Sequence, residues 1–423
     1  MPHPPALARP ISWRFFAGIL PVVAPRKHWT GGRRLICGSG PVLGLAAALA
    51  AVLAAAGCAP APAQTGGRPG QAAGTSASGR PAPPAITAAH ARQVFDRYVA
   101  AAASPTASHP ASPLHSLVTG VERAVLTATL ASHSVTSNGT ASTGQGAYRS
   151  SLTVKPALDV YTYGSPTFYV PEAAGYPRFF VASVTRTLPA AIPAADGTAT
   201  GPDGSDVPPD GPVLMLFSQA SAGAPWLLAS NSRLPAGVTL PKLATDSAGY
   251  IPTVPLSDAA LLAQPDNAGP LQAAVVDDGP SSTATKAVAT GPLTTGLYSG
   301  VRNHVDGMTA PPGDVYQWEL DGSSLPEFAL RTAAGGALVF YAMTQTTTVA
   351  VPDVINKADP IHPGPPIQVP LAVKMLLPVG QPDPLVQLSS EQLLSFAAID
   401  PAKGNAKLEV IAIGGGLTSA SAS

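Results

Sequence analysis

The chain has 423 residues, with 24 Lys and Arg against 24 Asp and Glu, and Gly and Pro together fill about a fifth of its positions. The balance is uneven along the chain, because six basic and no acidic residues precede residue 58, which leaves 18 basic against 24 acidic side chains in the remaining 366 residues. This mildly acidic part lacks the phosphate-neutralising surface of a nucleic-acid binder, and two cysteines are too few for a disulfide scaffold or a thiolate zinc cluster.

An export signal is the first element that the sequence predicts. Basic residues ending at position 34 precede an uncharged, Ala- and Leu-rich run over residues 35–57, which is the order of a secretory signal. The run ends in Ala-Ala-Gly-Cys at residues 55–58, which resembles a bacterial lipobox whose usual leucine is replaced by alanine. We therefore predict cleavage between Gly57 and Cys58 and lipidation of the Cys58 thiol with palmitate-type acyl chains. The alternative is an uncleaved signal or membrane helix, since the apolar run is at the short end of what spans a bilayer.

A flexible tether follows the lipidation site. Residues 59–85 contain no aromatic or large aliphatic side chain and are rich in Pro, Gly, Ala and Ser, so we assign 58–85 to the tether and 1–57 to the signal. The remaining part of the chain is longer than a single core usually supports. We therefore predict two domains, at 86–254 (the first half) and 255–423 (the second half).

The first half begins with helical patterns and continues with strand patterns. Thr87 is a good N-cap for a helix to about residue 103, and a second apolar stripe predicts a helix over about 114–132. The Ser-, Thr-, Asn- and Gly-rich segment 134–146 is interpreted as a loop. Strands are predicted over 151–155, 158–163, 167–170, 178–187, 213–219 and 226–231.

The second half repeats this order. Helices are predicted over 255–264 and 292–305, followed by strands over 315–320, 327–332, 337–344, 368–377, 393–399 and 407–413. The apolar run 178–182 corresponds in position to 337–341, and the hairpin pattern 214–232 corresponds to 393–414. The predicted fold class is therefore α+β, with two similar domains in which helices pack on a curved antiparallel sheet.

Several segments resemble a known family. They are YPRFF at 176–180, PWLL at 225–228, LP at 240–241 and LRTAAGGALVF at 330–340, and they resemble a family of uncharacterised actinobacterial secreted lipoproteins with a domain of unknown function. The resemblance implies a lipid anchor and an extracellular region, and it implies no catalytic residue. Each half also resembles a cystatin or NTF2-like unit in its element order, a fold that serves enzymes and binding proteins alike.

One acidic loop is a candidate metal site. The segment DGTATGPDGSDVPPDG at 196–211 holds Asp196, Asp203, Asp206 and Asp210 among glycines, and carboxylate oxygens on a flexible loop are the ligands that Ca²⁺ takes. The order of ligands in a calcium-binding EF-hand loop is missing, so a solvated hairpin loop is the competing interpretation.

No catalytic constellation is recognisable. The eight histidines lack metal-ligand spacing, and neither a G-x-S-x-G elbow nor a phosphate-binding loop occurs. We therefore assign no catalytic residue and no cofactor. Most aromatic residues fall in strand patterns, where they form a core or line a concave sheet face that holds a small apolar ligand.

These observations predict a non-catalytic, membrane-anchored lipoprotein on the outer face of the cell membrane. Its two domains would bind an envelope protein, a cell-wall component or a small ligand, and nucleic acid is excluded as a partner. The alternative is a cell-envelope hydrolase with a dispersed Ser or carboxylate site. A spacer or assembly factor is the third hypothesis.

Overall fold

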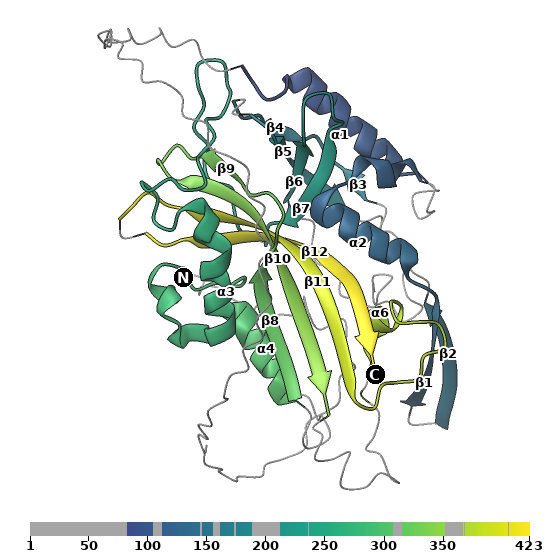
Figure 1. The fold of residues 1–423 in the computed structure, drawn as a ribbon. Coiled ribbons are helices and arrows are strands. Elements are labelled where there is room, and N and C mark those ends of the chain that lie inside the picture. The colour runs from purple at the N-terminus through teal and green to yellow at the C-terminus, as the bar shows by residue number, and fades with distance from the viewer. Residues whose placement is uncertain are drawn as a thin grey trace, which may run out of the picture. The chain divides into compact units, whose positions relative to one another are not determined.

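The fold is mixed α/β, with one large antiparallel sheet and few helices (Figure 1). The computed structural model describes residues 83–104, 112–143, 146–154, 161–172, 175–187, 212–235, 237–307, 315–351, 367, 369–404 and 406–423. Within these ranges, no helix combines the length and the hydropathy that a bilayer span requires.

The order of helices followed by strands occurs twice along the chain, and the short helix α6 lies between two strands of the second series. The helices are α1 (Ala88–Ala102), α2 (Gly120–Ala131), α3 (Ala268–Asp278), α4 (Thr295–Gly307) and α6 (Leu371–Lys374), with short 3-10 turns that include η2 (Pro113–Leu117) and η5 (Thr283–Lys286). The strands are β1 (Val135–Thr143), β2 (Gly146–Val154), β3 (Thr162–Tyr163), β4 (Thr167–Tyr169), β5 (Arg178–Thr187), β6 (Pro212–Gln219), β7 (Leu227–Arg233), β8 (Val315–Gly322), β9 (Phe328–Arg331), β10 (Ala337–Ala350), β11 (Gln387–Asp400) and β12 (Glu409–Ala422).

The strand order of the large sheet is symmetric about its centre. The order is β3-β5-β6-β7-β12-β11-β10-β8, with β4 paired to β5 and β9 paired to β10, while β1 and β2 form a separate hairpin. The first five strands of this sheet in chain order therefore make the same pairings as the last five. The order of helices matches as well, because Val118, between η2 and α2, bridges Leu228, and Val288, between η5 and α4, bridges Leu408.

The segment between the two halves joins the outer strands of the sheet. The Ile251 N–H donates to the Val170 carbonyl beside β4, and the Val254 N–H donates to the Ala329 carbonyl in β9. The large sheet therefore encloses an inner apolar core between its two halves. Phe179 of β5 meets Phe328 of β9 there, with ring centroids 4.5 Å apart.

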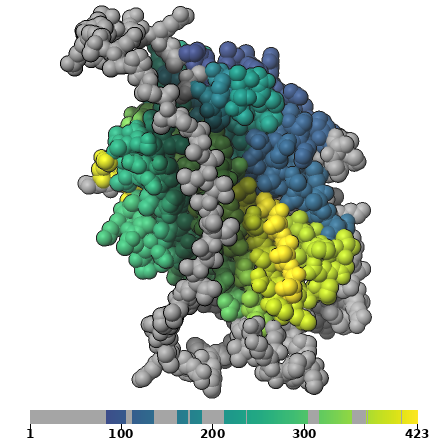
Figure 2. Space-filling model, in the orientation of Figure 1, coloured from purple at the N-terminus to yellow at the C-terminus, as the bar shows by residue number. Residues whose placement is uncertain are grey.

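The outer faces of the sheet are covered by helices. Alternate residues of β5 point to opposite cores, since Phe180 and Ala182 pack beneath α1 whereas Phe179 and Val181 face the inner core. In the second half, α3 lies on β8 and β10. The helix α2 of the first half contacts both β7 and β12, one strand from each half (Figure 1). The surface of α2, coloured blue in the space-filling view, adjoins the yellow C-terminal strand accordingly (Figure 2).

Four predicted elements are wrong, most of them because a partner elsewhere in the chain overrides the local pattern. The predicted helix 255–264 is a series of turns, and the predicted strand 368–377 contains the short helix α6 after Pro370. The predicted loop 134–146 contains β1, which pairs with β2 along its whole length. The predicted helix 114–132 is divided into η2 and α2, because Val118 takes an extended conformation to bridge Leu228.

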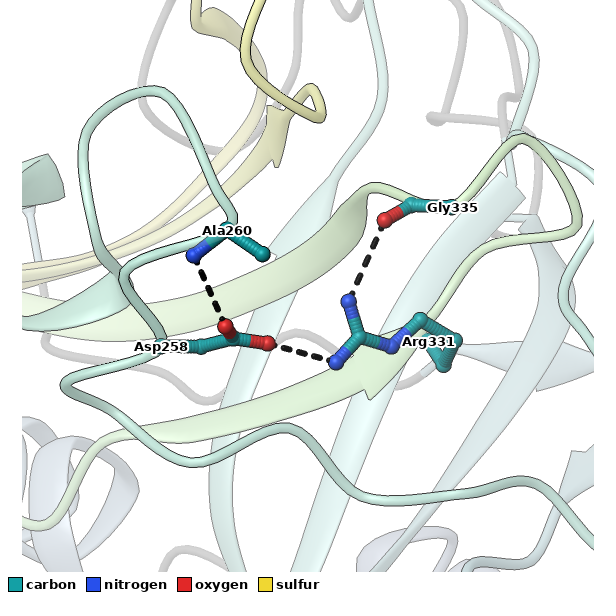
Figure 3. Close-up of polar contacts among 4 residues, drawn as sticks. All are labelled: Asp258, Ala260, Arg331 and Gly335. Atoms are coloured by element: carbon teal, nitrogen blue, oxygen red, sulfur yellow. Dashed lines mark hydrogen bonds and ion pairs between the residues drawn. The ribbon is translucent and has the colours of Figure 1, made fainter.

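The turns at 255–264 are held by an ion pair rather than by helical hydrogen bonds. Asp258 Oδ2 accepts a hydrogen bond from Arg331 Nη2 at 2.6 Å, and Oδ1 accepts one from the Ala260 N–H at 3.0 Å (Figure 3). Arg331 Nη1 donates to the Gly335 carbonyl at 3.1 Å, so this side chain ties the turns to β9 and to the turn before β10. The Arg331 hydrogen bond is the main cause that lowers the pKa of Asp258.

Candidate functional site

A cavity lies between α1 and the hairpin of β6 and β7. Its volume is about 310 Å³, which is at the small end of the range for ligand pockets. The lining residues come from α1, η2, β6 and the β6–β7 turn, and they are His90, Val94, Arg97, Tyr98, Leu117, Phe217, Gln219, Gly223, Ala224, Pro225 and Trp226.

The helix α1 presents one face to this cavity. Thr87 caps the helix, since its Oγ1 accepts a hydrogen bond from the His90 N–H at 3.2 Å. From this start, Val94 follows His90 by four residues, and Arg97 and Tyr98 follow Val94 by three and four residues, so the four side chains share a side of the helix. The other wall is a tight turn, which Gly223 enters with a φ of 78° and which Gln219 holds by donating to the Ala224 carbonyl at 2.7 Å.

The floor of the cavity is aromatic. Tyr98 meets Phe217 edge to face, with centroids 6.1 Å apart at an interplanar angle of 81°. Beneath them, Phe180 stacks on Phe217 at 4.8 Å and contacts Trp226 at 5.3 Å. Because these rings are fixed by one another, the lining side chains are preorganised rather than free to collapse into the cavity.

The rim of the cavity carries cationic and neutral polar groups. Arg97 and His90 are exposed, and the lining contains no carboxylate, Ser or Cys. The cavity therefore offers donors and a positive charge above an apolar floor, and its lining has no Ser, Thr, Cys, Asp or Glu side chain.

A half-buried polar cluster lies behind the floor, next to Tyr98. The Tyr98 and Tyr163 side chains are hydrogen-bonded to each other, and burial raises the pKa of both groups. Burial also raises the pKa of Glu122 to about 7, against the opposing effects of the Arg186 charge and of hydrogen bonds from the side chain and backbone of Asn231.

Arg186 is held in this cluster from two sides. Its Nη1 donates to Asn231 Oδ1 at 3.1 Å, and its guanidinium lies 4.1 Å from the centre of the Tyr161 ring. The cluster thus contains one cation and one carboxyl group, both half-buried among α2, β5 and β7.

A second raised carboxyl pKa occurs in the second half. Burial and the neighbouring Asp321, Asp278 and Glu319 raise the pKa of Asp277 to about 6, although its carboxylate accepts a hydrogen bond from the Leu320 N–H. In the described part of the chain, no three His, Cys, Asp or Glu side chains converge as a metal site would require.

The residues predicted for lipidation and metal binding lie outside the described residues. These are Gly57, Cys58, Asp196, Asp203, Asp206 and Asp210, so the lipid anchor and the calcium loop stay predictions. Of the aromatic residues, Trp226 lines the cavity, and Trp318 packs against the core under α3.

Sequence reasoning missed the polar side of the cavity. Val94 and Tyr98 belong to the apolar side of the first helix, and Tyr98 is buried at 8% exposure. The available signal was the spacing of His90 and Arg97, which places both on the side of α1 that carries Val94.

Comparison with known proteins supports the lipoprotein resemblance. The family described as Domain of unknown function (DUF8094) matches residues 82–422. The "Uncharacterized lipoprotein SCO6871" of Streptomyces coelicolor is 30% identical over 198 residues, which cover 45% of this chain and 48% of that protein. The match therefore spans about half the length of this relative. No solved structure matches the chain.

Proposed function

Because the chain belongs to the family of the domain of unknown function DUF8094 and is similar to a protein named as a lipoprotein, we propose that it is a lipoprotein anchored through Cys58. Cleavage before Cys58 would remove the basic segment and the apolar run, and the acylated cysteine would hold the mature chain on the outer face of the cell membrane. The tether 58–85 would then separate the folded region from the lipid surface.

The folded region is a non-catalytic binding module, and the cavity beside α1 is its site. The observation that carries this proposal is a preorganised aromatic floor under a polar rim, which is the usual composition of a small-ligand site. The alternative of a cell-envelope hydrolase finds no support at this cavity, because its lining offers no Ser, Cys, Asp or Glu. The ligand would be a small molecule of the envelope.

The two halves derive from one repeated unit of the cystatin or NTF2-like type, with a boundary near residue 254. The symmetric strand order and the matching bridges of Val118 and Val288 support this proposal. The halves differ at the hairpin turn that faces their first helix. In the second half, Leu261 bridges Ala402 in the β11–β12 turn, so a segment of the same chain packs against that turn.

The anchor is tested by the mass of the protein in its membrane fraction. Wild type should yield a diacylated chain that begins at Cys58, and Cys58→Ala should yield no acylated species. An unmodified wild-type chain that retains residues 1–57 would overturn the lipoprotein proposal.

Binding is tested through the fluorescence of Trp226. The sequence contains four tryptophans, of which Trp13 and Trp29 precede Cys58, so Trp318→Phe leaves Trp226 as the only tryptophan of the mature chain. Small-molecule fractions of the envelope should shift its emission in this variant and should lose that effect on addition of Leu117→Phe, which narrows the cavity without adding a tryptophan. If no fraction changes the emission, the cavity is not the binding site.

A further inference from the structure

The charge around the cavity distinguishes among classes of small ligand. The arginines of α1 are in different situations: Arg92 Nε lies 3.8 Å from Asp96 Oδ2, whereas Arg97 has no carboxylate partner among the described residues. Arg97 lines the cavity and Arg92 does not. The guanidinium of Arg97 would repel a cationic ligand in the cavity, and it would form an ion pair with an anionic one.

The floor selects the body of the ligand. Tyr98, Phe217 and Trp226 offer ring edges and faces, which pair with another aromatic ring more favourably than area burial alone accounts for. A volume of about 310 Å³ accommodates a body of about two fused rings. The ligand is therefore small, and its ring system would lie on the floor with its charged end at the rim.

The second half supports the idea that this position receives an apolar group. There the Leu262 N–H donates to the Pro401 carbonyl at 2.9 Å, and the Lys403 N–H donates to the Ala260 carbonyl at 3.0 Å. This segment places Leu261 in the core with 0% exposure beside the β11–β12 turn. The corresponding β6–β7 turn lines an open cavity instead, so an external group can take the place that Leu261 takes in the second half.

We propose that the cavity beside α1 binds a small aromatic anion, with the rings on Tyr98, Phe217 and Trp226 and the anionic group on Arg97. This inference rests on the proposed binding function of the cavity and adds the chemical class of the ligand. His90, about two turns before Arg97 on the same side of α1, supplies a second donor at the rim.

Two probes of equal shape and different charge test this assignment. The full chain in lipid nanodiscs is titrated with 2-naphthoate and with the neutral 2-naphthamide by calorimetry, and empty nanodiscs serve as the blank. We expect 2-naphthoate to bind at least about threefold more tightly than 2-naphthamide, since an exposed ion pair adds a modest attraction. Added salt should reduce the difference.

Variants on one helix provide the controls. Arg97→Gln should bring the affinity for 2-naphthoate down to that for 2-naphthamide, and Arg97→Lys should retain most of the difference. Arg92→Gln, which changes the same charge outside the cavity, should leave both affinities unchanged. Unaltered thermal unfolding of each variant excludes a folding defect as the cause.

The outcomes separate this inference from the proposed function. Equal binding of both probes that is lost in Trp226→Ala would overturn the anion assignment and keep the cavity as a binding site. A preference for 2-naphthoate that persists in Arg97→Gln would also overturn the assignment to Arg97. Binding of neither probe would overturn the inference, whereas the proposed function would still be decided by the Trp226 emission with envelope fractions.

Discussion

Ser232 of β7 donates a hydrogen bond to Ser395 of β11 across the junction of the two halves, with 2.9 Å between the two Oγ atoms. Both residues are about 1% exposed, so neither hydroxyl has water as an alternative partner. The bond lies beside the junction of β7 and β12, where Ile413 pairs with Arg233. A buried polar contact at this point fixes the register of the halves relative to each other.

Removal of one hydroxyl of this pair should lower the free energy of unfolding by more than the net contribution of the hydrogen bond, because the other hydroxyl stays buried without its partner. Ser395→Ala leaves the Ser232 hydroxyl without an acceptor, and we expect the free energy of unfolding to fall by about 1–3 kcal/mol. Ser232→Ala should have a similar effect, and the double variant should lose clearly less than the sum of the two single variants. Urea denaturation of the four proteins measures this coupling. Ser299→Ala, at an exposed hydroxyl on α4, is the control and should change stability by less than about 0.5 kcal/mol. Additive effects would contradict the coupling.

A glycine allows the close approach of β12 to β7. A Cβ on Gly414 would lie 1.7 Å from the Asn231 carbonyl oxygen, and the clash is with backbone that no rotamer change relieves. Gly414→Ala should therefore lower the free energy of unfolding by on the order of 3–5 kcal/mol or prevent folding. The matched control is Gly300→Ala on α4, where no atom lies within 4 Å of the added methyl group. This control should raise stability by up to about 1 kcal/mol, because alanine favours a helix over glycine. Equal stability of the two variants, measured by denaturation, would show that the junction is looser than described.

The ion pair of Asp258 and Arg331 should make the stability difference between wild type and Asp258→Asn depend on pH. The Arg331 hydrogen bond lowers the pKa of Asp258, so the carboxylate stabilises the fold above its ordinary unfolded pKa of about 3.9. This contribution is lost as the pH falls through the lowered folded pKa. Asp258→Asn should therefore be less stable than wild type at pH 7, and the two denaturation midpoints should converge toward pH 3. A gap of constant size over this range would show that the charge of Asp258 is irrelevant to stability.

The parts of the fold that depend on local pattern were predictable. The range of β5 was predicted to the residue, because a run rich in aromatic and β-branched residues and free of Gly and Pro continues from 178 to 187, and Thr87 marks the start of α1 by its capping oxygen. The helix α3 was missed because Gly269 and Pro270 occupy its first turn, although proline is tolerated there.

Features that depend on distant partners were not predictable. The hairpin strand β1 is rich in Ser, Thr, Asn and Gly, so its pairing with β2 is what distinguishes it from a loop. The cavity has the same origin: α1 shows an apolar stripe, and no local pattern reveals that the β6–β7 turn leaves an open volume beside this stripe. The ion pair of Asp258 with Arg331 joins residues 73 positions apart and likewise leaves no local signal.

The half-buried carboxyl of Glu122 should make the protein less stable as the pH rises. Its pKa is raised by burial to about 7, above the unfolded value of about 4.3, so the folded state binds this proton more tightly than the unfolded state does. The resulting stability is fully present below about pH 4.3 and is lost as the pH rises through about 7. Arg186 and Asn231 limit the loss, because both favour the ionised carboxylate, and the Tyr98 and Tyr163 hydroxyls stay neutral over this range.

Glu122→Gln removes this titration and keeps the shape of the side chain. At pH 4 the wild-type carboxyl is protonated, so the variant should match wild type in free energy of unfolding. At pH 8 the variant should be more stable by on the order of 1–3 kcal/mol. Each unit of pKa shift corresponds to about 1.4 kcal/mol, and the loss of the ionic partner of Arg186 reduces the gain. Denaturation at pH 4, 5, 6, 7 and 8 measures the difference. Asp277→Asn provides the comparison. Burial raises the pKa of Asp277 to about 6, so the stability that depends on its proton should already be lost at a lower pH than for Glu122. A wild-type pH dependence that persists unchanged in Glu122→Gln would show that Glu122 is ionised in the fold at little cost, and that Arg186 and Asn231 compensate for its burial.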